Sequence, residues 1–337
     1  SEKAVLAVRT AVPEIKFLLF NLDLLDLFLL RKLHMGSFYK PMELEVWSPD
    51  WSLPSVDIDC LYILAYAQFS NVKLEVKSTN NPFRSSSLPV FHHYKHHITD
   101  LRKIVDYFKS KGHDADGSLS NKDQAEILAY ENMLREKLYP AIQYTFWVDD
   151  TNRMEVVRPW YWKRIPFPFH FFYVGRYQSK AQDLISVIHP DVEDMKLKES
   201  YILAEAQACI SHLATRLDRT AGPYFFGAAP SSLDALVFAY LGPLLKAPLK
   251  NSSFQAHARA QPNLARFVLS ICQNHFKTSY QEFEQKRRKE EKEKSDKGDL
   301  DFPHTLRNSI LAAIFATCAM TGYAASIGLI HFSLRHK

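Results

Sequence analysis

A histidine-rich segment contains the residue type that most often binds transition metals. It comprises His92, His93, His96 and His97. Neutral imidazole is a good zinc ligand, so this spacing could serve a metal site. No cysteine or carboxylate stands at metal-ligand spacing beside it, and paired histidines of this kind are mostly solvated surface. We therefore predict no metal site, and no motif in the chain indicates a cofactor.

The thiol groups are the next candidates for chemistry. The four cysteines are far apart and make no CxxC pair: Cys60, Cys209, Cys272 and Cys318. Such spacing is typical of free thiols in a reducing compartment. Cys60 falls one turn into a predicted helix, where a packing role is favoured over a nucleophilic one. No catalytic residue is predicted.

An aromatic-rich stretch, WYWKRIPFPFHFFY, runs from Trp160 to Tyr173. Its prolines and the charges at Lys163 and Arg164 argue against one continuous buried helix. Two interpretations stay open: core packing between helices, or a partly exposed face for a partner or a bilayer surface, where aromatic residues concentrate. The candidate partner surface comprises Trp160, Tyr161, Trp162, Phe167, Phe169, Phe171 and Phe172.

Near its end the chain contains a run of 21 uncharged residues, from Ile310 to Ile330. A helix of that length rises about 31 Å, which matches the hydrocarbon thickness of a bilayer. A buried core helix is the alternative, but it would normally show a polar face. Since only seven residues follow the run, insertion would be post-translational. We predict a transmembrane tail anchor at residues 309–331.

The composition of this anchor favours one membrane. It is rich in small residues, among them Gly322, Ala324 and Gly328, and basic residues flank it on both sides. Moderate hydrophobicity with basic flanks favours the mitochondrial outer membrane. Ala324 and Gly328 form a small-xxx-small pair that could seat a partner helix.

Charge and composition also indicate what the linker before the anchor and the N-terminal extension could be. The net charge of +5 is spread along the chain, so no basic face for nucleic acid is predicted. Residues 279–308 form a linker of mixed charge, which either tethers the body or contacts anionic lipid. Residues 1–41 form an extension of unclear status, either an amphipathic helix or a segment foreign to the working protein. Its apolar run at 17–30 is short and interrupted by acidic residues.

Regular patterns begin at residue 42. The spacing of apolar residues predicts a strand, a helix and a strand, then a strand with Pro89 at its start, and a second helix. This order within about 70 residues indicates a small α/β domain at 42–116. The predicted elements are 42–47, 56–69, 74–78, 88–91 and 97–112.

Helical patterns continue through residues 117–278. Helices are predicted at 123–146, with a kink at Pro140, and at 196–217 and 262–276. Before the apolar stripe of PSSLDALVFAYL, Ser231 and Asp234 match a capping box with Asp in place of the commoner Glu. A second, all-helical domain follows from these patterns.

Several of these segments resemble a known family. The proline-led third strand and the capping box after Tyr224-Phe225-Phe226-Gly227 resemble the glutathione-transferase fold: a thioredoxin-like α/β domain followed by an all-α domain. MELEVWSPDWSLPSVD, YTFWVDDTNRMEVVRPWY, PFPFHFFYVGR and YFFGAAPSSLDALVF resemble segments of the metaxins in the same order. With the C-terminal transmembrane helix, the chain is similar to the tail-anchored, metaxin-1 type of that family.

The resemblance also bears on catalysis. A glutathione transferase needs a hydroxyl or thiol after its first strand, where this chain has Ser48 and Ser52, and an acid-Ser pair at the helix after the third strand. At the start of the helix after the third strand, where the family has the acid-Ser pair, this chain has Asp100-Leu101. The side chain of Leu101 has no hydrogen-bonding group, so the resemblance implies that the glutathione-binding pair is disrupted. We expect no enzyme activity.

The function implied by the resemblance is that of a non-enzymatic subunit of the mitochondrial outer-membrane sorting and assembly machinery. Its expected partners are a second metaxin-type subunit, the β-barrel core subunit, β-barrel precursors and an inner-membrane organising complex. Two alternatives stay open. One is a membrane-anchored glutathione-dependent transferase, and the other is an outer-membrane adaptor for organelle contacts or transport.

Overall fold

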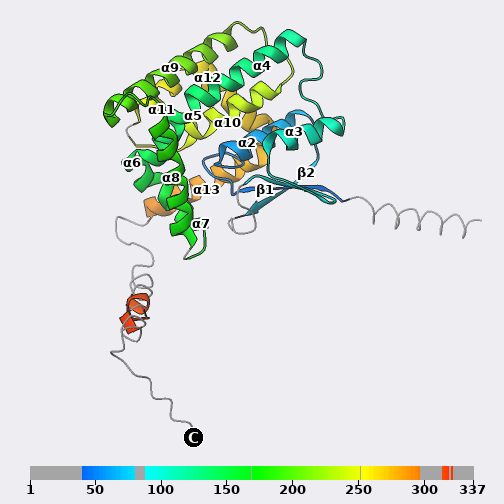
Figure 1. Ribbon diagram of the computed structural model, residues 1–337. Helices are drawn as coiled ribbons and strands as arrows, with labels where there is room; N and C mark the ends of the chain where they lie inside the picture. The colour runs from blue at the N-terminus through cyan, green and yellow to red at the C-terminus, as the bar shows by residue number, and fades with distance from the viewer. Residues whose placement is uncertain are drawn as a thin grey trace, which may run out of the picture. The chain divides into compact units, whose positions relative to one another are not determined.

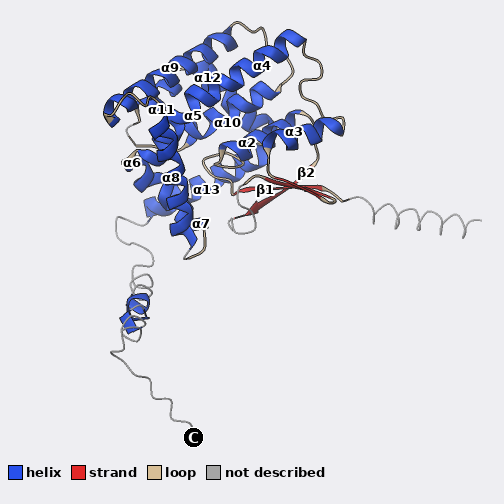
Figure 2. Cartoon of the chain, viewed as in Figure 1, coloured by secondary structure: helices blue, strands red, loops and turns tan. Residues whose placement is uncertain are grey.

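The structure, a computed structural model, describes residues 40–79, 88–167, 169–250, 252–296, 313–318 and 320–321. The chain divides into two compact units, residues 1–284 and 285–337. The first unit is the body, which contains a sheet and a layer of helices (Figures 1 and 2). The boundary between the units falls within helix α13 (Lys277–Asp296).

The predicted extension and tail anchor lie mostly outside the described residues. Only residues 40 and 41 of the extension are described. Of the predicted span at 309–331, residues 313–318 and 320–321 are described; they are helical and exposed. Within the described ranges, no helix combines the length and the apolar character needed to cross a bilayer. The tail anchor therefore stays a prediction.

A four-stranded mixed sheet forms the N-terminal part of the body. β1 pairs in parallel with β2 and antiparallel with β3, which in turn pairs antiparallel with β4. The three strands expected from the sequence are present, and Pro89 directly precedes β3 after a cis peptide bond. In the order of the sheet the strands are β2 (Leu74–Thr79), β1 (Met42–Trp47), β3 (Val90–His93) and β4 (His96–Ile98).

The helix predicted at residues 97–112 begins later than expected, because its first residues belong to β4. Helix α3 (Leu101–Ser110) begins after Asp100, whose carboxylate accepts a hydrogen bond from Lys103 N at 2.9 Å. The predicted helix start was wrong because the pairing of β4 with β3 is a tertiary contact. Local apolar spacing does not report such a contact.

Helices α2 (Ile58–Phe69) and α3 pack against the sheet (Figure 1). Helix α2 begins after Asp57, whose carboxylate accepts a hydrogen bond from Cys60 N at 3.0 Å. Most residues of α2 are buried, because α2 contacts the sheet-bearing part on one side and α10 on the other. The two parts of the body are therefore joined through α2.

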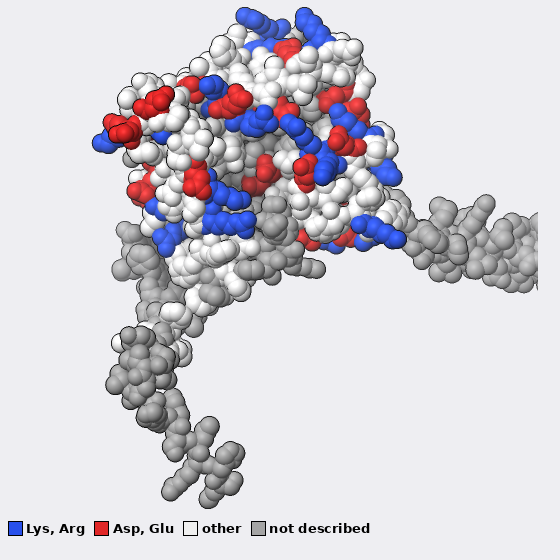
Figure 3. All heavy atoms as spheres, in the orientation of Figure 1, with Lys and Arg blue, Asp and Glu red and all other residues white. Residues whose placement is uncertain are grey.

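The remainder of the body is helical. Its α-helices are α4 (Asn121–Met133), α5 (Tyr139–Gln143), α6 (Asp150–Asn152), α7 (Arg158–Arg164), α8 (Phe169–Val187), α9 (Met195–Asp218), α10 (Ser232–Lys246), α11 (Ser253–Arg259) and α12 (Pro262–His275). Short π-helical segments connect α4 to α7, at Leu134–Leu138, Tyr144–Val148 and Arg153–Val157. On the face shown in Figure 3, basic and acidic side chains are interspersed over these helices.

The helix predicted at residues 123–146 is a helical segment interrupted by π-helical turns. Pro140 has no N–H to donate to the carbonyl four residues earlier, and a π-helical segment directly precedes the helix that contains it. Wider π turns commonly absorb such a defect in the hydrogen-bond ladder. The segment therefore continues through Pro140 instead of ending there.

Helix α10 begins at the capping box of Ser231 and Asp234, and both of its reciprocal hydrogen bonds are present. Asp234 Oδ2 accepts from Ser231 N at 2.8 Å and from Ser231 Oγ at 2.6 Å. Asp234 Oδ1 also accepts from Phe225 N at 2.9 Å. Because Asp234 is fully buried, this carboxylate is the common acceptor that holds the helix start and the preceding aromatic turn together.

Candidate functional site

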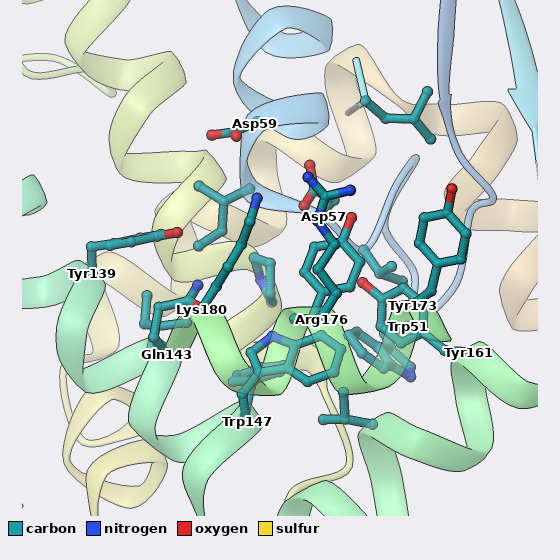
Figure 4. Close-up of a pocket in the computed structure, with 18 residues that line it drawn as sticks. Trp51, Asp57, Asp59, Tyr139, Gln143, Trp147, Tyr161, Tyr173, Arg176 and Lys180 are labelled. Atoms are coloured by element: carbon teal, nitrogen blue, oxygen red, sulfur yellow. The ribbon is translucent and has the colours of Figure 1, made fainter. Parts of the chain in front are cut away.

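A pocket of about 190 Å³ lies where the start of α2 faces α5 and α8 (Figure 4). Pockets at the junction of two parts of a fold are common ligand sites. Aromatic side chains form much of its wall: Trp51, Tyr139, Phe146, Trp147, Tyr161, Tyr173 and Tyr177. The pocket is therefore the first candidate site of the body.

Four charged side chains line this pocket. Asp57 and Asp59 come from the start of α2, while Arg176 and Lys180 extend from α8 toward them (Figure 4). Among the described residues, no ion pair joins either basic side chain to a carboxylate. The pocket thus brings two carboxyl groups and two basic groups together within an aromatic wall, an arrangement suited to polar binding.

The two carboxyl groups of the pocket have raised pKa values. Burial raises the pKa of Asp57, against the lowering effect of the hydrogen bond from Cys60 N. Burial and the negative charge of Asp57 raise the pKa of Asp59 to about 7. The side chain of Asp59 is exposed at the pocket, and the apolar wall beside it together with Asp57 disfavours its charged form. Asp59 therefore changes charge near neutral pH.

Replacing Asp59 with asparagine is expected to flatten the pH dependence of stability. The pKa of Asp59 is higher in the folded chain than the ordinary 3.8, so the folded state binds more protons between about pH 4 and pH 7. Stability from this group is present at low pH and is lost as the pH rises through 7. With a discount for solvent screening, the Asp59→Asn variant should melt about 2–4 °C above the parent at pH 8 and close to it at pH 5. Equal melting shifts at both pH values would contradict the assignment.

The residues considered for thiol chemistry are absent from the described lining of this pocket. Cys60 is fully buried, and burial raises the pKa of its thiol well above the usual range. Ser52 is also buried and donates to Glu284 Oε1 at 3.4 Å, while Ser48 does not line the pocket. Leu101 packs at the edge of the core. No serine, threonine, cysteine or histidine is found among the described lining residues.

The four histidines lie on the hairpin of β3 and β4. His93 is buried, with Nδ1 2.6 Å from Tyr107 Oη and Nε2 3.0 Å from Lys40 O, and burial lowers its pKa. His92 Nε2 lies 3.6 Å from Glu45 Oε1. In the described ranges, no three potential ligands come together in a metal-binding group. These contacts give His93 a structural role in the sheet.

The structure corrects the placement of Trp160 and Tyr161. Both were predicted to contribute to a partner surface, but each side chain is only 6% exposed. Tyr161 packs against Trp47 of β1, with ring centroids 5.2 Å apart. Trp160 Nε1 donates to Asp50 Oδ2 at 2.7 Å, and Arg164 Nη2 reaches the same oxygen at 2.5 Å. These residues therefore join the helical part to the sheet-bearing part and are unavailable to a partner.

The phenylalanines of the same stretch are exposed and form what we call the Phe patch. Phe167 is 63% exposed, Phe169 41%, Phe171 54% and Phe172 63%. Trp162 lies partly buried beneath the patch, with its ring 5.1 Å from that of Phe171. The predicted partner surface thus separates into a buried pair and an exposed group, and the exposed group is the second candidate site.

The sequence was compared with curated proteins. Metaxin-1 of Sus scrofa is 37% identical over 297 residues, which cover 86% of this chain and 91% of the relative. The chain belongs to the metaxin family. Metaxin-3 of Danio rerio is also 37% identical, over 241 residues that cover 70% of this metaxin and 76% of that protein.

Two family profiles match parts of this metaxin. Residues 60–178 match the family described as outer mitochondrial membrane transport complex protein, and residues 206–271 match the glutathione S-transferase C-terminal domain. Family membership and the first profile indicate a component of a transport complex of the outer mitochondrial membrane. The second profile, with the thioredoxin-like sheet, confirms the glutathione-transferase-like fold of the body.

Solved structures were compared as well. A glutathione S-transferase of Ceriporiopsis subvermispora in complex with glutathione superposes with a TM-score of 0.48 at 12% identity. The superposition covers 70% of this metaxin and 98% of that protein.

Sequence reasoning missed the charged residues of the pocket in this metaxin. Asp57 carries the signal of a helix N-cap, which explains its position but not its place in a pocket. On α8, Arg176 and Lys180 are four residues apart and so share one side of the helix. That spacing could have singled them out as a pair, but their approach to α2 is set only by tertiary packing.

Proposed function

We propose that this metaxin is a non-enzymatic subunit of the mitochondrial outer-membrane sorting and assembly machinery, which aids the import and insertion of β-barrel proteins. Its tail anchor at residues 309–331 holds the body on the cytosolic side. Its partners are a second metaxin-type subunit, the β-barrel core subunit and β-barrel precursors, and it further contacts an inner-membrane organising complex. The observation that carries this proposal is the similarity to metaxins over most of the chain.

The composition of the pocket supports a role without catalysis. A glutathione transferase stabilises a thiolate with a hydroxyl or thiol placed after the first strand, and the residues at that place here lie outside the described pocket lining. Burial also raises the pKa of the pocket phenols, Tyr161 and Tyr177 among them, so they remain neutral at physiological pH. The role of the body is then to bind proteins.

The exposed surfaces of the body are the places where such binding can occur. The Phe patch is the exposed remainder of the predicted partner surface. Contiguous exposed apolar groups of this kind usually mark an interaction site. We assign the Phe patch to an interaction at the outer mitochondrial membrane.

Crosslinking of the full chain in intact mitochondria tests the proposed function. We expect crosslinks to a second metaxin-type subunit and to newly imported β-barrel precursors, and resistance of the chain to alkaline extraction. A chain without residues 309–331 should be released by the same extraction, because the hydrocarbon-length helix supplies the attachment. Retention of the purified chain on glutathione resin, with turnover lost in the Ser48→Ala or Ser52→Ala variant, would instead establish the transferase alternative.

A further inference from the structure

The Phe patch lies at the corner between α7 and α8. In the view of Figure 1 this corner is at the lower end of the helical part of the body. Phe167 and Phe171 contact each other, with ring centroids 6.3 Å apart, and Phe172 is 63% exposed. Four exposed phenylalanines at one corner are an unusual feature for a surface that meets only water.

Charge distinguishes this corner from the rest of the surface. Residues 156–182 contain five basic residues and no acidic residue. Arg158 stacks on the ring of Trp162, and Arg164 is paired with Asp50. Lys163, Arg176 and Lys180 are exposed. In Figure 3 the lower end of the body shows an uncharged surface with basic side chains directly above it.

The spacing along α8 places an exposed phenylalanine and two basic residues one turn apart. Phe172, Arg176 and Lys180 are four residues apart and therefore follow one another on the same side of the helix. From Phe172 the helix rises about 6 Å to Arg176 and about 12 Å to Lys180. If α8 lies along the membrane normal, insertion of Phe172 by the roughly 5–10 Å typical of interfacial apolar groups leaves the basic residues of α8 at or above the level of the lipid phosphates.

We propose that the Phe patch inserts into the interface of the membrane that carries the tail anchor, and that the exposed Lys163 contacts anionic lipid headgroups. This assignment rests on the membrane attachment in the proposed function and names the occupant of the same surface. A lipid surface fits better than a protein partner, because the buried centre of a protein interface is depleted of charged residues and lysine is disfavoured there. Aromatic tips beside basic side chains are instead typical of interfacial membrane contacts.

The test places an environment-sensitive nitrobenzoxadiazole fluorophore on the full chain. Cys60, Cys209 and Cys272 are buried, so a Cys318→Ser background leaves only an introduced cysteine for labelling. Phe172→Cys is the test position, and Leu128→Cys on α4 is the matched control, since Leu128 is 60% exposed. The labelled chains are reconstituted into phosphatidylcholine vesicles with about one third anionic phospholipid.

We expect a blue shift and a severalfold gain in emission for the probe at position 172, together with quenching by spin-labelled lipid. The probe at position 128 should keep the weak, red-shifted emission of a fluorophore in water. A chain that floats with the vesicles while both probes report water would overturn this inference and leave the anchor intact. A chain that does not float would overturn the anchor and the inference together.

Two further experiments distinguish a lipid surface from a protein partner as the ligand of the Phe patch, and test the contribution of charge. A probe at position 172 that shifts only after outer-membrane proteins are added would assign the Phe patch to a protein and overturn the proposal. The emission gain should shrink in high salt and in vesicles without anionic lipid, because exposed basic groups act through screened electrostatics. The Lys163→Gln variant should weaken this lipid dependence, and an unchanged dependence would contradict the headgroup contact.

Discussion

Replacing Asp234 with alanine is expected to lower the free energy of unfolding of the body by about 4 kcal/mol. The carboxylate accepts hydrogen bonds from Ser231 N, Ser231 Oγ and Phe225 N, and it is fully buried. Alanine leaves these donors without an acceptor in a place that water does not reach. Each buried group left unpaired costs about 1–3 kcal/mol, which exceeds the loss of an ordinary helix cap.

A second capping box provides the matched control. Ser120 and Asp123 form the same pair of hydrogen bonds at the start of α4, but at the surface. The Asp123→Ala variant should therefore lose only about 1 kcal/mol. Urea unfolding of the full chain in detergent, followed by tryptophan fluorescence, measures both, since all five tryptophans lie in the body. Equal losses in the two variants would show that burial of the Asp234 box adds nothing.

The Asp50→Ala variant is expected to destabilise the body by about 2–3 kcal/mol. Asp50 follows β1, and its carboxylate accepts hydrogen bonds from Trp51 N at 2.8 Å, Trp160 Nε1 at 2.7 Å and Arg164 Nη2 at 2.5 Å. The side chains of Asp50 and Arg164 are each 19% exposed. Its removal leaves a sheltered guanidinium and an indole N–H unpaired, and the contact between the sheet-bearing part and α7 is weakened.

A pair of the same chemistry with an exposed carboxylate shows what solvent does to such a contact; its arginine, 17% exposed, keeps a second hydrogen bond to Gln178. Arg153 pairs with Asp150, whose side chain is 84% exposed. The Asp150→Ala variant should cost less than about 1 kcal/mol, because water and salt screen the pair. The same urea titration compares the two variants. A loss at Asp50 no greater than the loss at Asp150 would mean that Asp50 does not hold the two parts of the body together.

Local patterns were sufficient for much of the fold. The alternation of apolar residues located β1, and the capping box located the start of α10 to the residue. Both are encoded by neighbours in the chain: a strand repeats every two residues, and a cap is closed by groups three residues apart. The resemblance of several short motifs to metaxins, taken in order, led to the family that the comparisons show.

Contacts between distant residues account for the errors. The start of α3 was misplaced because β4 exists only through its pairing with β3. Trp160 and Phe172 belong to one aromatic stretch, and composition gave no means to tell that the first is 6% exposed and the second 63%. Whether an aromatic ring is buried depends on the surface it meets, and for Trp160 that surface is a turn after β1, 110 residues away.

The sequence by itself determined most of the element types, the cap of α10 and the family, because these depend on spacing within a few residues or on motifs read in order. Tertiary structure alone decided which aromatic residues form the core, and it alone brought Asp57 and Asp59 of α2 to the same pocket as Arg176 and Lys180 of α8. The physical reason is that burial, and the pKa values and docking surfaces that follow from it, arise only when separate elements exclude water from one another.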